Sequence, residues 1–143
     1  MQWFLVALLA LALGLGACAS EAQEKSVSGN VTHVRDGDTI EVADVPVRFD
    51  GVAAPELSEP YGEQAKLAMR GLVAGKQVRC DLTGKKTYDR WIGTCYLPDG
   101  ENLSAAIIGM GLARDCPRYS GGRYKQYETD RSRRLSFPKY CRP

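Results

Sequence analysis

Apolar and β-branched residues gather in five short segments of the chain, each bounded by turn-forming residues, and this pattern is typical of β-strands. The segment 27–34 alternates between apolar and polar positions, as expected for a strand with one buried face. Asp36-Gly37 gives a turn signal before the next segment. The last two segments fit an antiparallel pair joined by a polar loop over residues 83–90. The expected strands span residues 27–34, 39–42, 47–52, 77–82 and 91–97.

Three further segments have a helical pattern. Apolar residues form a stripe between residues 61 and 74, and Gly75 follows where a C-terminal cap is expected. A second helix is expected over residues 103–110, and a third, basic helix over 123–134. Five strands with a helix inserted after the third match a small OB-type barrel. The expected fold class is therefore mainly β with α (α+β), a five-stranded OB-fold barrel with three helices.

The N-terminus carries an export signal. Residues 3–17 form an uncharged apolar run, which is typical of a signal peptide and too short for a comfortable membrane span. The end of the run, Leu15-Gly16-Ala17-Cys18, is similar to a bacterial lipobox, in which Cys18 would be lipidated; ordinary signal cleavage nearby is the alternative. Both interpretations predict an exported protein of the cell envelope or periplasm, lipid-anchored or secreted. Residues 1–18 then lie outside the fold, 19–25 form a tether and 26–143 form the domain.

The length and the charge of the chain further limit its possible domain organisation and binding partners. The 143 residues suffice for one domain with a hydrophobic core. The net charge of +2 is too small to indicate nucleic-acid binding by itself, but residues 111–143 hold nine Lys or Arg against three Asp or Glu. This basic third could lie against phosphate, or it could be a solvated basic helix.

Four cysteines remain once Cys18 is set aside, and an even number in a small exported domain is typical of disulfides. Of the three possible pairings, Cys80–Cys95 and Cys116–Cys141 are favoured. The first would join the two neighbouring strands, and the second would pin the C-terminal tail. Zinc is disfavoured, because the spacings contain no C-x-x-C and the chain has a single histidine.

Charged residues with the chemistry of phosphodiester cleavage recur in three segments, residues 35–39, 48–56 and 88–90. Cleavage needs the phosphate neutralised, a water positioned and its proton accepted. A cation held by carboxylates and planar arginine donors serve the first need, and a nearby carboxylate serves as base. The candidates are Asp38 for the metal, Arg48 and Arg90 for the phosphate, and Glu56 for the base.

These segments, in this order and spacing, resemble the thermonuclease family, the micrococcal-nuclease-like OB-fold enzymes, from about Val31 to Arg134. The resemblance rests on the Asp-Gly-Asp-Thr turn, the Arg-x-x-Gly-Val-x-Ala-Pro-Glu segment, Tyr-x-Arg, and the stretch over residues 99–113. It implies a nuclease that uses a divalent metal, calcium above all, and cleaves DNA or RNA with little sequence specificity.

The resemblance also implies a role for each matching position. Every one of these residues has a simpler interpretation as a turn, strand or surface residue, and His33 is best read as a plain strand residue. The implied roles are metal binding for Asp38 and the backbone carbonyl of Ala54, an outer-shell carboxylate for Asp36, phosphate binding for Arg48 and Arg90, general base for Glu56, and nucleotide contact for Tyr88 and Tyr119.

Two positions depart from the family pattern. Ala53 stands where a second metal-binding aspartate is usual, and the loss of a carboxylate should weaken a cation that prefers six or more oxygens. Strand alternation points Asp50 away from Ala53, so Asp36 is the better replacement. Asp89 stands where glycine commonly follows the tyrosine, and it adds negative charge beside Arg90.

Three hypotheses follow. The first is an exported, disulfide-bonded, metal-dependent nuclease that acts as a monomer on DNA or RNA. The second is a non-catalytic OB module that binds single-stranded nucleic acid or a protein partner. The departures from the family pattern at Ala53 and Asp89 favour this hypothesis. The third is a structural lipoprotein of the envelope, attached to the membrane through Cys18, which would show no salt-sensitive binding to DNA.

Overall fold

The computed structural model describes residues 25–143. The predicted signal peptide, the lipidation candidate Cys18 and nearly all of the predicted tether lie outside the described residues. Within residues 25–143, no helix combines the length and the apolar character needed to cross a membrane.

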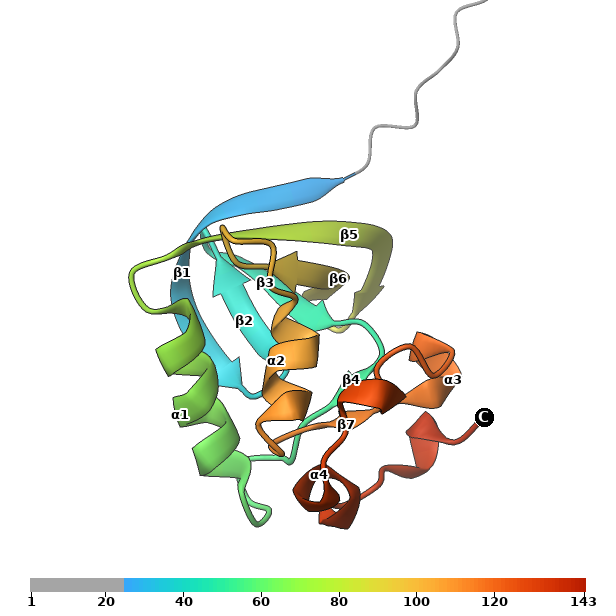
Figure 1. Cartoon of the computed structure of the whole chain (residues 1–143). Coiled ribbons are helices and arrows are strands. Elements are labelled where there is room, and N and C mark those ends of the chain that lie inside the picture. Colours follow the sequence, from blue (N-terminus) through green and yellow to red (C-terminus); the bar gives the residue numbers. More distant parts are fainter. Residues whose placement is uncertain (1–24) are drawn as a thin grey trace, which may run out of the picture.

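Five strands close into a barrel in the order β1-β2-β3-β6-β5 (Figure 1). Neighbouring strands are antiparallel except β3 and β6, which run parallel and close the barrel. This arrangement confirms the expected α+β fold class with a five-stranded barrel. The strands are β1 (Ser26–Asp36), β2 (Thr39–Val42), β3 (Val45–Phe49), β5 (Gln77–Thr87) and β6 (Arg90–Tyr96).

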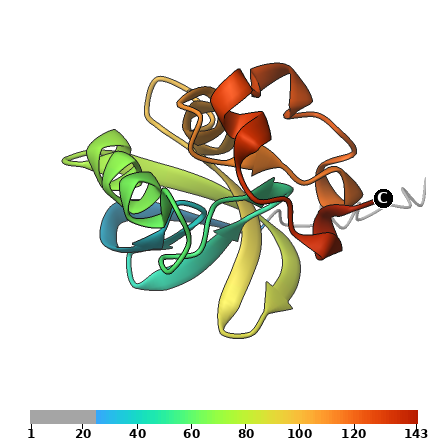
Figure 2. The same ribbon diagram turned by 90° about the horizontal axis from the view of Figure 1, so that it is seen from below.

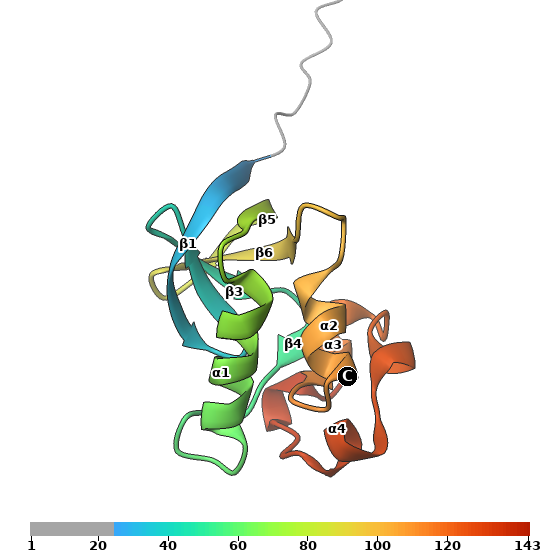
Figure 3. The same ribbon diagram turned by 60° about the vertical axis from the view of Figure 1, so that its left-hand side comes forward.

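A smaller sheet and two helices complete the body of the protein. β4 (Val52–Ala53) pairs with β7 (Arg114–Asp115) in a two-stranded antiparallel sheet outside the barrel. Helix α1 (Gly62–Val73) packs on β1, and α2 (Leu103–Gly109) packs on β6 and on α1, so that the two helices lie side by side (Figure 3).

The core lies between the barrel and these helices. Helix α1 buries Ala65, Met69 and Val73, which stand four residues apart and so share one face of the helix. They meet buried barrel residues such as Ile40 and Phe49. Each fully buried side chain of this size stabilises the fold by about 1.5–3 kcal/mol.

The third predicted strand is broken, and the break is what leads the chain out of the barrel. β3 ends at Phe49 and β4 begins at Val52. Between them Gly51 has φ 73°, and a Cβ atom on it would lie 2.6 Å from the Cβ of Ser120. Only glycine allows this left-handed turn and this close approach of the two segments.

The predicted loop over residues 83–90 is wrong in its extent. β5 continues to Thr87, and a tight turn at Tyr88 and Asp89 leads directly into Arg90, the first residue of β6. Polar side chains concealed this strand, because its outer end projects from the barrel and has no buried face.

The predicted basic helix over residues 123–134 is also wrong. Two short helical turns occupy that range, η1 (Lys125–Tyr127) and α4 (Asp130–Arg134), and two more flank it, α3 (Pro117–Ser120) and η2 (Lys139–Cys141). Thr129 has an extended backbone and caps α4 in a capping box with Ser132. The Ser132 hydroxyl donates a hydrogen bond to the carbonyl of Ile108 at 2.8 Å, so tertiary contacts determine where this helix begins.

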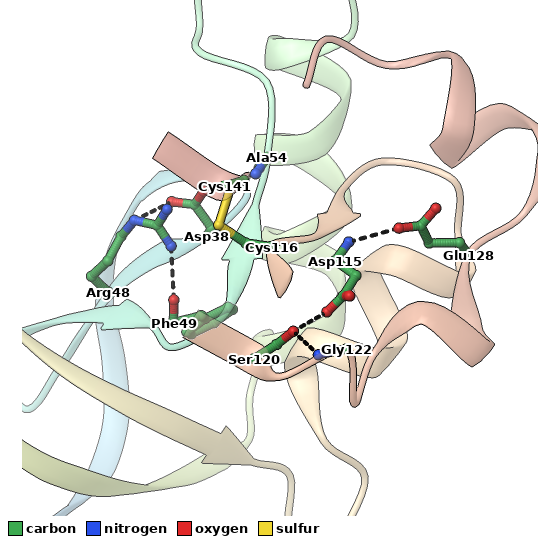
Figure 4. The surroundings of a disulfide bond; sticks show 10 residues. All are labelled: Asp38, Arg48, Phe49, Ala54, Asp115, Cys116, Ser120, Gly122, Glu128 and Cys141. Atoms are coloured by element: carbon green, nitrogen blue, oxygen red, sulfur yellow. Dashed lines mark hydrogen bonds and ion pairs between the residues drawn. A yellow bond between two sulfur atoms is a disulfide. The ribbon is translucent and has the colours of Figure 1, made fainter. Parts of the chain in front are cut away.

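Both favoured disulfides are present, which confirms the pairing. Cys80 and Cys95 lie directly opposite each other on β5 and β6. Cys116 follows β7 and is bonded to Cys141 of η2, so that the tail is fastened to the small sheet (Figure 4).

Candidate active site

A cleft of about 440 Å³ opens where the β2–β3 end of the barrel meets the C-terminal segment. Residues from the turn before β2, from β3, from the β5–β6 turn and from the C-terminal helical turns line it. The structure thus brings together most of the residues predicted from the sequence: Asp36, Asp38, Arg48, Glu56, Tyr88, Arg90 and Tyr119 all line this cleft.

Strand register accounts for this convergence. Thr39 of β2 lies opposite Arg48 of β3, and Arg48 lies opposite Ile92 of the parallel strand β6. Arg90, at the start of β6, donates from Nη1 to the Thr39 hydroxyl at 3.4 Å. Residues far apart in the sequence therefore meet because the barrel closes.

Asp38 is the most firmly held carboxylate of the site. It is 6% exposed and accepts hydrogen bonds from the backbone N–H of Ala54 at 2.8 Å and from the Thr39 hydroxyl at 3.1 Å. Arg48 Nε lies 3.4 Å from its Oδ1. Because Thr39 also accepts from Arg90, one buried hydroxyl links Asp38 to Arg90, whereas Arg48 contacts Asp38 directly.

Asp36 lies beside Asp38 and accepts a hydrogen bond from its backbone N–H at 2.9 Å. Burial, reinforced by the negative charge of Asp38, raises the pKa of Asp36 to about 7. A cation bound between the two carboxylates would offset the repulsion from Asp38 that helps to raise the pKa of Asp36.

Arg48 is fixed by two partners. Besides Asp38, its Nη1 donates to the carbonyl of Phe49 at 2.8 Å (Figure 4). Burial lowers the pKa of Arg48, but Asp38, Tyr140 and Asp36 together outweigh burial, so the pKa lies above its usual value. Arg48 is therefore a permanent cation aimed into the cleft.

Arg90 and Glu56 are held less tightly. Arg90 lies over the Tyr88 ring at 5.8 Å and makes two hydrogen bonds of 3.4 Å. The backbone N–H of Glu56 donates to Glu59 at 2.9 Å, whereas its exposed carboxylate makes no hydrogen bond or ion pair with any residue in 25–143. That carboxylate is free to accept a proton from water.

Ala53, at the position where a second metal-binding aspartate is usual, contributes packing contacts in place of a carboxylate. Its side chain is 3% exposed and lies against the Cys116–Cys141 disulfide, together with Phe137. Asp50 does not compensate, because its carboxylate pairs with Arg123 at 3.1 Å.

The remaining donors fit a divalent cation that keeps most of its water. No cluster of three or more His, Cys, Asp or Glu suited to a metal occurs in residues 25–143. Asp36 and Asp38 supply carboxylate oxygens, which hard divalent cations such as calcium prefer, and water would have to complete the shell.

Asp89 points away from the phosphate site. Its carboxylate binds Arg35 at 2.7 and 3.0 Å, and Arg35 also binds Glu41 at 3.0 Å. The hydrogen bond from Arg35 holds the pKa of Asp89 below its usual value. The expected competition with Arg90 is thus relieved, because the charge of Asp89 is neutralised by a different arginine.

One of the tyrosines that line the cleft was missed. Tyr140, on the turn η2, lines the cleft with Asp38 and Arg48 although it lies in a tail without helical or strand pattern. The predicted Cys116–Cys141 bond was the signal that could have found it, since that bond draws the tail to the small sheet beside the cleft.

Comparison with known proteins gives a consistent result. A family model described as staphylococcal nuclease homologue matches residues 46–133. An uncharacterized endonuclease of Escherichia coli O157:H7 is 37% identical over 108 residues, which are 73% of this chain and 65% of that protein. A micrococcal nuclease of Shigella flexneri is 27% identical over 125 residues, covering 79% of this chain and 72% of that protein. The chain therefore spans about two thirds of the length of such relatives.

Proposed function

This chain belongs to the staphylococcal nuclease homologue family. On that basis we propose that it is an exported phosphodiester hydrolase that cuts DNA or RNA. The reaction depends on a divalent cation, for which calcium is the first candidate. The observation that supports this most strongly is the meeting of Asp38, Arg48, Glu56 and Arg90 in one cleft. These groups supply the charge neutralisation and the base that the reaction requires.

The two arginines bind the scissile phosphate. Arg48 stays oriented by Asp38 and by the Phe49 carbonyl, so its donors are fixed before substrate arrives. Fixed donors stabilise the charge that builds on the phosphate oxygens in the transition state. Because such contacts read the backbone and not the bases, low sequence specificity follows.

Glu56 accepts the proton of the attacking water. Its exposed position beside the cleft gives water access to the carboxylate. A positioned base of this kind contributes on the order of 10²–10⁴-fold to the rate.

Asp38 and Asp36, with the backbone carbonyl of Ala54, would hold the cation. When bound there, calcium supplies positive charge that neutralises the phosphate and orients water. Asp38 also orients Arg48, because its Oδ1 lies 3.4 Å from Arg48 Nε and forms an ion pair with it.

Two tyrosines at the rim offer platforms for nucleobases. Tyr88 is 92% exposed and Tyr119 is 53% exposed, and both line the cleft. Stacking on such rings contributes roughly 1–3 kcal/mol per base and accepts any sequence.

One observation favours a second candidate function, a module that binds nucleic acid or a protein partner without cutting. Ala53 packs against a disulfide where a carboxylate would face the cation. The surviving arginines would then bind phosphate without catalysis.

The two functions are separated by timed cleavage of single- and double-stranded DNA and RNA with calcium, with other divalent ions and with chelator. The protein is purified with both disulfides formed, and Glu56→Gln is compared with Glu63→Gln, which alters an exposed carboxylate of α1. Metal-dependent cutting that Glu56→Gln abolishes and Glu63→Gln preserves supports the nuclease. Salt-sensitive binding without cutting supports the binding module, and cutting that both variants retain contradicts the assigned base.

The proposed location is the cell envelope, with a lipid on Cys18 or with the chain secreted. Mass spectrometry of the exported protein and of Cys18→Ser tests this. A diacylglyceryl mass on the wild type only supports the anchor, and identical masses apart from the substitution rule it out.

A further inference from the structure

Tyr140 lies beyond the part of the chain that the family pattern covers. The family match ends at residue 133, and Tyr140 occupies η2 near the C-terminus. η2 packs against α3, and the C-terminal segment folds back beside the barrel (Figure 2). The tail of this chain thus adds an aromatic residue to a cleft whose other lining residues all lie before residue 120.

A covalent anchor determines where Tyr140 lies. The next residue, Cys141, is fully buried and bonded to Cys116. The backbone N–H of Cys116 in turn donates to the carbonyl of Gly51 at 2.9 Å. Tyr140 is therefore one residue away from a point that is tied, through Gly51, to the end of β3.

The Tyr140 hydroxyl faces the charged groups of the site. Tyr140 lines the cleft together with Arg48, Asp38 and Glu56, and the charges of all three act on its phenol. A guanidinium group can only donate, so beside Arg48 the phenol oxygen would accept and its own O–H would be left for another partner. Since the residue is 46% exposed, the open cleft is available to that donor.

Tyr140 also remains a donor at neutral pH. Burial raises the pKa of its phenol above the usual value, so the proton stays on the oxygen. A neutral phenol beside a guanidinium adds a second hydrogen-bond donor to the place where a phosphate oxygen would bind.

We propose that Tyr140 is a further phosphate-binding residue, which donates a hydrogen bond to a non-bridging oxygen of the phosphodiester held by Arg48, and that the Cys116–Cys141 disulfide positions it. This inference rests on the proposed function of the cleft. The same disulfide packs against Ala53 and adjoins Tyr140, so it lies between the position that lacks a carboxylate and the position that supplies a phenol.

The first test replaces Tyr140 by Phe, which keeps the ring and removes only the hydroxyl. The matched control is Tyr127→Phe, at an exposed tyrosine of η1 outside the cleft. We expect Tyr140→Phe to lower kcat/KM on an oligonucleotide roughly tenfold to a hundredfold, as for loss of a hydrogen bond to a charged group. The inhibition constant for inorganic phosphate should rise with it, a change that a purely structural role would not cause. Equal behaviour of the two variants overturns the proposal.

A second arm separates this inference from the proposed function. Binding of a labelled single-stranded oligonucleotide is measured in chelator, where metal-dependent cutting cannot occur. If the wild type binds but never cuts, weaker binding by Tyr140→Phe than by Tyr127→Phe supports the inference although the nuclease proposal fails. If the wild type cuts and both variants match it, only the inference fails, and if it neither binds nor cuts, both fail.

A third arm tests the role of the disulfide. Tyr140→Phe is compared in the wild type and in Cys116→Ala/Cys141→Ala, with thermal melting as a check of folding. If the disulfide positions the phenol, removal of the hydroxyl should have little further effect once the bond is gone. Independent, multiplying losses would overturn the positioning role. The first test keeps both disulfides intact and does not depend on the stability of the cysteine variants.

Discussion

The two sides of the cleft are stabilised in different ways. On the barrel side, the register of β2, β3 and β6 places Asp38, Arg48 and Arg90. On the C-terminal side, short helical turns are held by a disulfide, by side-chain caps and by the contact between Ser132 and Ile108. The charged groups assigned to the chemistry lie mainly on the barrel side, and two of the proposed substrate contacts, Tyr119 and Tyr140, lie on the C-terminal side. This difference predicts that substitutions on the barrel side abolish activity, whereas substitutions on the C-terminal side weaken substrate binding.

Arg48→Ala gives the largest expected effect, because it removes a phosphate donor and leaves Asp38 as an unpaired buried charge. We expect kcat/KM to fall about 10²–10³-fold and the free energy of unfolding to fall by about 3 kcal/mol. Kinetics and urea unfolding measure both. Arg79→Ala, at an exposed arginine paired with Asp81 on β5, is the control and should change little. Comparable losses in the two variants would contradict the special role of the barrel side.

Removal of the Cys116–Cys141 disulfide should cost about 3 kcal/mol of unfolding free energy, because the bond closes a loop with a sequence separation of 25. Substrate KM should rise more than kcat falls, since the barrel residues stay in place. Cys80→Ala/Cys95→Ala is the comparison, because those cysteines join strands that are already paired. If that variant raised KM equally, the assignment of binding to the C-terminal side would be wrong.

Ala53→Asp places a charge where the barrel side and the C-terminal side of the cleft meet. The new carboxylate would be buried against the disulfide, and we expect a loss of about 2 kcal/mol in the free energy of unfolding and no gain in cleavage. Ala53→Asn separates the effect of size from that of charge. Metal-dependent cutting above the wild-type rate would show instead that the carboxylate reaches a cation, and the packing argument would fail.

Thr129→Ala has the smallest expected effect. It removes the side-chain cap of α4, for which a loss of about 1 kcal/mol is typical. Local amide exchange in α4 should accelerate while exchange in β2 and β3 stays the same. Acceleration throughout the barrel would show that the two sides form one cooperative unit.

The sequence predicts the barrel side much better than the C-terminal side, for a physical reason. Alternating apolar residues and turn residues determine strands locally, and the charged motifs lie at strand ends, so the sequence alone indicates the positions of Asp38, Arg48 and Arg90 in the barrel. The break between Phe49 and Val52 depends instead on the close approach of Gly51 to Ser120, which is a tertiary contact.

The C-terminal side could not be predicted in the same way. Its basic residues suggested one helix, but the extended backbone at Thr129 and the contact of Ser132 with Ile108 divide the segment. Tyr140 carries no local signal, since a bond between residues 116 and 141 brings it to the cleft.

The parallel ladder between β3 and β6 has a consequence for folding. It pairs Val47 with Trp91 and Arg48 with Ile92, although these residues are far apart in the sequence. Contacts of such high sequence separation form late, after the entropy of closing a long loop has been overcome. Before that step Arg48 and Arg90 are on separate parts of the chain, and afterwards they flank one cleft. The appearance of activity during refolding would therefore time the closure of the barrel itself, and a fragment that lacks either strand would contain only half of the phosphate-binding pair.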